Sequence, residues 1–69
     1  MSMGDVYGMR CKIRFLNRNP NYKGVLYERF NRRNGKITIV NAFRGHEIEV
    51  CTGSAIEVTK HLEKLLESL

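Results

Sequence analysis

The chain has 69 residues, of which 42% are apolar and 28% are charged, and its formal net charge is +5. This length allows one small domain with a thin core, which excludes the cleft between lobes that a two-substrate enzyme needs. The composition is typical of a globular protein and excludes a disordered chain. We therefore expect one domain over residues 1–69, taken from a longer protein, without a catalytic site or a cofactor.

Targeting and redox signals are sparse. No run approaches the roughly 18 apolar residues of a membrane span, and residues 1–10 lack the apolar segment of a secretory signal. Cys11 and Cys51 have no metal-type partner such as C-x-x-C, so we interpret both as reduced core residues. These features predict a cytoplasmic protein with no membrane association, as a monomer or a small homo-oligomer.

The first apolar pattern is in residues 9–16, with the sequence MRCKIRFL, where apolar and basic side chains alternate. Met9, Cys11, Ile13 and Phe15 are apolar, and a cation stands between each pair. Alternation with period two is typical of a half-buried strand. We predict a strand here, with these four side chains in the core.

A second strand is predicted over residues 23–30, after a turn cluster that contains Pro20. Gly24 near its start indicates a sharp bend, which short strands need when they close into a small barrel. Asn34-Gly35 then predicts a tight hairpin, because both central positions of a primed turn favour positive φ.

Two more strands are predicted over residues 36–43 and 46–51, joined by a turn at Arg44-Gly45. The apolar spacing then changes to three or four residues, which predicts a helix over residues 54–68. The fold class we predict is mainly β, a strongly bent antiparallel Sm/SH3-like barrel with a C-terminal helix. The alternative is an α+β four-stranded sheet covered by that helix.

Catalytic and metal motifs are absent from the sequence. His46 and His61 have no nucleophile or acid at a recognisable spacing, and there is no glycine-rich phosphate loop. We predict neither a catalytic residue nor a metal site.

The cations are concentrated in the first two thirds of the chain. Residues 1–46 carry ten Lys/Arg against two acidic residues, a net +8, and residues 47–69 carry two Lys against five Glu, a net −3. Alternate residues of a strand stand about 6.6 Å apart, close to the phosphate repeat of a single nucleic-acid strand. Such cations can equally be ordinary solvent-facing residues. The nucleic-acid-binding residues we predict are Arg10, Lys12, Arg14, Arg32, Arg33, Lys36 and Arg44.

Residues 5–50 resemble the Sm-like (LSm) domain, in particular its divergent branch in decapping enhancers and in translational repressors of the Trailer hitch type. The resemblance rests on DVYG at residues 5–8, YKGVLY at residues 22–27 and KITIVNAF followed by RG at residues 36–45. Gly24 matches the bent-strand glycine of the first Sm motif. The glycine-bearing second Sm motif has no counterpart.

This resemblance implies a non-enzymatic adaptor in mRNA decapping or translational-repression complexes of ribonucleoprotein granules. Its partners would be decapping or repression proteins that present short apolar helices. The partner-binding residues we predict are Val25, Tyr27, Ile39 and Phe43, as a helix-binding groove. Two other functions compete with it. One is a basic small-barrel module that binds RNA, and the other is a self-association module that uses the C-terminal helix, apolar on more than one side, and exposed strand edges. The path of residues 54–62 discriminates between folds, because a closed Sm barrel requires a strand there.

Overall fold

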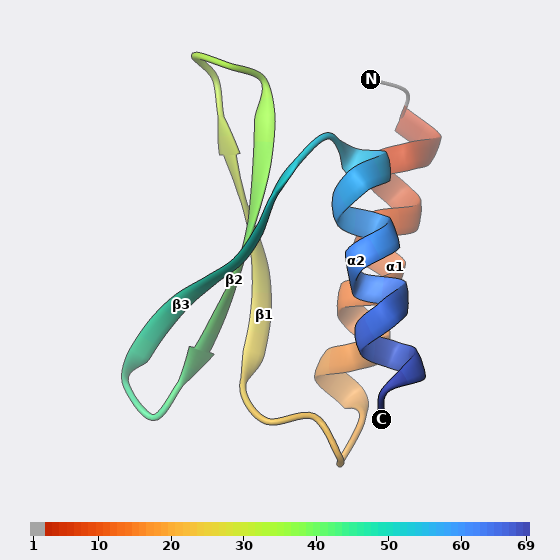
Figure 1. Ribbon diagram of the computed structural model, residues 1–69, viewed down its shortest axis with the longest axis vertical. Helices are drawn as coiled ribbons and strands as arrows, with labels where there is room; N and C mark the ends of the chain where they lie inside the picture. Colours follow the sequence, from red (N-terminus) through yellow and green to blue (C-terminus); the bar gives the residue numbers. More distant parts are fainter. Residues whose placement is uncertain (1–2) are drawn as a thin grey trace.

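The computed structural model describes residues 3–69 as two helices packed on one antiparallel sheet. The elements in chain order are α1 (Met3–Arg18), β1 (Val25–Asn31), β2 (Lys36–Phe43), β3 (His46–Gly53) and α2 (Ala55–Glu67). The strand order is β1-β2-β3, so each hairpin joins neighbouring strands. Both helices lie side by side on one face of the sheet, and no helix within residues 3–69 covers the other face, which we call the uncovered face (Figure 1).

The hydrophobic core lies between the helices and the sheet. Each of its three sides contributes buried apolar residues: Met9, Ile13 and Leu16 from α1, Leu26, Ile37 and Ile39 from the sheet, and Ala55, Val58 and Leu62 from α2. The spacing of three or four residues within each helix places these side chains on one stripe, and the stripes of both helices face the same core.

The prediction of a strand over residues 9–16 is wrong, because these residues belong to α1. The apolar residues Val6, Met9, Ile13 and Leu16 are spaced by three or four, and this helical stripe reaches the core. In a helix, Phe15 is turned away from that stripe, and its side chain is 69% exposed. The period-two alternation over residues 9–15 was therefore a by-product of a longer helical pattern.

The predicted mainly β barrel is not formed, since the sheet is open and has three strands. The α+β alternative fits better, with α1 in the place of the first predicted strand. Residues 54–62 lead into and form α2, and not the strand that would close an Sm barrel. A capping box starts this helix, because the Ser54 hydroxyl accepts from the Glu57 N–H at 3.2 Å while the Ser54 N–H donates to the Glu57 carboxylate at 3.3 Å.

The tight two-residue turn predicted for the first hairpin is found in the second hairpin instead. Asn34-Gly35 is not a tight two-residue turn: β1 and β2 are joined by residues 32–35, and among these only Gly35 has positive φ. Arg44-Gly45 is the two-residue turn, with φ of 52° and 81°. Positive φ at both central positions matches the right-handed twist of the strands, which explains why this hairpin accepts a strained arginine.

Neither α1 nor α2 is long and apolar enough to span a membrane.

Candidate nucleic-acid interface

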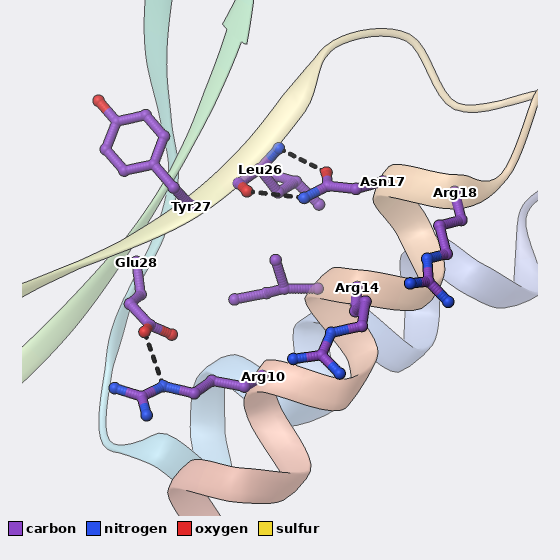
Figure 2. A pocket seen from close by; sticks show the side chains of 8 residues that line it. Arg10, Arg14, Asn17, Arg18, Leu26, Tyr27 and Glu28 are labelled. Carbon is purple, nitrogen blue, oxygen red and sulfur yellow. Dashed lines mark hydrogen bonds and ion pairs between the residues drawn. The ribbon is translucent and has the colours of Figure 1, made fainter.

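Three arginines form a row along one side of α1. Arg10, Arg14 and Arg18 are four residues apart, so each is one helical turn, about 6 Å, from the next. Figure 2 shows their side chains projecting from the same side of the helix, next to β1. We call this set the arginine row.

The arginine row borders a groove of about 410 Å³ between α1 and β1. Arg10 donates from Nε to the Glu28 carboxylate at 2.8 Å across this groove (Figure 2). Within residues 3–69, neither Arg14 nor Arg18 forms an ion pair. Two of the three guanidinium groups are therefore available to an anion from solution, whereas Arg10 is partly neutralised.

The groove is held in shape by Asn17, which binds the edge of β1. Its amide nitrogen donates to the Leu26 carbonyl at 3.0 Å, and its amide oxygen accepts from the Leu26 N–H at 2.7 Å (Figure 2). The side chain thus takes the position of a neighbouring strand at this residue. It fixes the C-terminal end of α1, and with it the arginine row, against the sheet.

Replacing Asn17 by alanine should lower the free energy of unfolding by about 2 kcal/mol, because two backbone groups of the buried Leu26 lose their partners. Urea denaturation followed by circular dichroism measures this change. Asn21→Ala is the matched control, since the Asn21 side chain makes no hydrogen bond among residues 3–69, and it should change stability by less than about 0.5 kcal/mol. Equal effects of the two variants would contradict the role of Asn17.

The outer side of α1 also carries exposed aromatic residues. Tyr7 and Phe15 are 72% and 69% exposed, and both belong to the i, i+4 ridge Met3–Tyr7–Cys11–Phe15 beside the arginine row. Cys11, predicted as a core residue, instead lies on this ridge and is half-buried. Next to it is a depression of about 180 Å³ lined by Cys11, Arg14, Phe15 and Arg18.

The predicted nucleic-acid-binding residues divide into three groups. Arg10 and Arg14 lie together in the arginine row, but Lys12 lies half-buried on a different side of α1, because a spacing of two residues turns a helix by about 200°. The hairpin residues separate further: Arg32, Arg33 and Lys36 lie at the β1–β2 turn, while Arg44 lies at the β2–β3 turn. In Figure 1 these two turns are at opposite ends of the sheet.

Arg18 was missed by the sequence analysis. Its signal was the spacing Arg10–Arg14–Arg18, which has meaning only once this segment is recognised as a helix.

The predicted partner-binding residues do not line one groove. Ile39 is fully buried beneath the helices. Val25 and Tyr27 alternate with the buried Leu26, so they point to the uncovered face of the sheet. Phe43 lies at the end of β2, where the Arg44 guanidinium stands 5.1 Å from its ring centroid.

Among residues 3–69, the groups with shifted pKa values lie away from the arginine row. Burial raises the pKa of the Tyr22 hydroxyl and that of the Cys51 thiol, so both stay protonated at neutral pH. The hydrogen bond that the Arg29 guanidinium donates to the Tyr27 hydroxyl raises the pKa of Arg29. Within residues 3–69 no three His, Cys, Asp or Glu side chains come together as a metal site.

Comparisons with protein-family models, with curated proteins and with solved structures gave no match. The likeness of residues 5–50 to Sm-like domains therefore stays a prediction.

Proposed function

We propose that this protein binds RNA, and that the arginine row of α1 is the contact with the phosphate backbone. The observation that carries the proposal is the alignment of Arg10, Arg14 and Arg18 on one helix side with a single carboxylate partner among residues 3–69. Guanidinium groups suit phosphate because they present several donors in a fixed plane.

The distribution of charge also favours α1 as the part of the molecule that contacts RNA. Helix α1 carries four cations against Asp5, a net +3, whereas β3 carries two glutamates and α2 carries three glutamates against two lysines. A polyanion is therefore attracted towards α1 and is repelled by the acidic residues of β3 and α2.

The proposal is tested with the double variant Arg14→Gln/Arg18→Gln and a fluorescently labelled RNA. Affinity at low salt should fall by about tenfold or more, because two phosphate contacts and the counterion release that accompanies them are lost. The slope of log affinity against log salt should become shallower by about 1.4 for a single strand. Fluorescence anisotropy at several salt concentrations measures both quantities.

The matched control is Arg32→Gln/Arg33→Gln, which removes the same charge from the β1–β2 turn. This variant should retain most of the affinity. If both double variants lose affinity equally, binding depends on net charge alone and not on the arginine row. If wild-type protein binds no RNA at low salt, the proposed function is wrong.

A second candidate is the adaptor function implied by the Sm-like resemblance. The observation that favours it is the uncovered sheet face, where Val25 is 57% exposed and lies near the half-buried Tyr27. A leucine-rich helical peptide added to isotopically labelled protein should then shift the NMR signals of these two residues. Shifts confined to α1, or no shifts, would count against an adaptor at this face.

A further inference from the structure

The depression on the outer side of α1 has a composition that suits a flat, electron-rich ring. It has a volume of about 180 Å³ and is lined by Arg14, Phe15, Arg18 and the small side chain of Cys11. We propose that it receives an unpaired base of the RNA strand whose phosphates contact the arginine row. This inference rests on the proposed function and specifies its ligand as single-stranded RNA.

Phe15 is the residue that indicates a base as the ligand. Its side chain is 69% exposed and contributes nothing to the core formed by Met9, Ile13 and Leu16. A phenyl ring beside two cationic side chains offers a stacking surface and phosphate donors at one place, which is the combination that single-strand binders use.

The two arginines that line the depression strengthen this assignment. Neither Arg14 nor Arg18 has an ion-pair partner among residues 3–69, so both guanidinium planes are available for stacking or for a phosphate. A purely apolar ligand would leave these charges without a partner. A duplex would offer them phosphates, but its bases are already stacked and cannot cover Phe15.

The test compares three ligands by fluorescence anisotropy: a short oligouridine, an abasic strand with the same number of phosphates, and an RNA duplex. We expect Phe15→Ala to weaken binding of the oligouridine by about tenfold and to leave binding of the abasic strand unchanged. Phe15→Tyr should restore the affinity, because it keeps an aromatic face. Circular dichroism of each variant verifies that the fold is intact.

The matched control is Phe43→Ala, which removes another exposed phenylalanine that stands beside an arginine, at the far end of β2. It should leave oligouridine binding unchanged. Equal loss for Phe15→Ala on the base-bearing and abasic strands would overturn the inference, as would a preference for the duplex that Phe15→Ala does not alter. The proposed function would survive either result provided that Arg14→Gln/Arg18→Gln still lowers the affinity for RNA by about tenfold or more.

Cys11 provides a second readout that needs no substitution. Bound oligouridine should slow alkylation of the Cys11 thiol by at least about fivefold, as expected for a strand that covers the depression, while the abasic strand should not. Peptide mapping distinguishes Cys11 from Cys51, which packs against the core and serves as the internal reference. Equal protection of Cys11 by both strands would contradict the base site.

Discussion

Ile39→Ala is expected to lower the free energy of unfolding by about 3–4 kcal/mol, because it leaves a cavity at the centre of the core. Ile39 has no exposed surface and lies on the middle strand, in the cluster to which both helices contribute. A domain of this size has only a few kcal/mol of stability, so the variant should be largely unfolded at 37 °C. Thermal and urea denaturation measure the loss.

Ile48→Ala is the matched control, because Ile48 is an isoleucine of the neighbouring strand that is 64% exposed. It should change stability by less than about 0.5 kcal/mol. Ile39→Val should give an intermediate loss of about 1 kcal/mol and remain folded, so that the cost can be measured even where alanine abolishes the fold. If the Ile39→Ala variant were stable and lost only partner binding, Ile39 would be a partner-binding surface residue, as the sequence analysis predicted.

Gly24→Ala should destabilise the protein by about 3 kcal/mol, because Gly24 adopts a conformation that side chains rarely allow and has no space for one. Its φ is +106°, and an added Cβ would stand 2.5 Å from the Asn41 amide oxygen and 2.9 Å from the Ala42 carbonyl oxygen. Asn41 cannot turn aside without cost, since its amide oxygen accepts the Tyr22 hydroxyl at 3.1 Å. Denaturation curves measure the change.

Gly35→Ala separates backbone strain from the clash. Gly35 also has positive φ, at +68°, but no atom lies within 4 Å of a Cβ added there. Its substitution should cost about 1 kcal/mol, the usual penalty of a left-handed residue. If Gly24→Ala costs no more than Gly35→Ala, the contact with Asn41 and Ala42 is not what requires glycine at position 24.

The arginine row shows how much of the candidate site the sequence could predict. The sequence analysis predicted Arg10 and Arg14 as phosphate contacts, but it placed them on a strand. On a strand, Lys12 would share their face. The helix removes Lys12 from the set and adds Arg18, because side chains four residues apart lie on the same side. Ile39 and Phe43 were paired in one groove by their apolar character, and only the packing of α1 and α2 separates them.

The sequence by itself determined the elements whose signals are local. The strand over residues 36–43, the turn at Arg44-Gly45 and the capped helix after Ser54 depend on β-branched residues, on backbone conformation and on a reciprocal pair of hydrogen bonds. Only the tertiary structure decided the conformation of residues 9–16, because their apolar residues fit a period of two as well as one of 3.6. The helix places Val6, Met9, Ile13 and Leu16 against the sheet and α2 together, so their burial in a common core selects it over the strand.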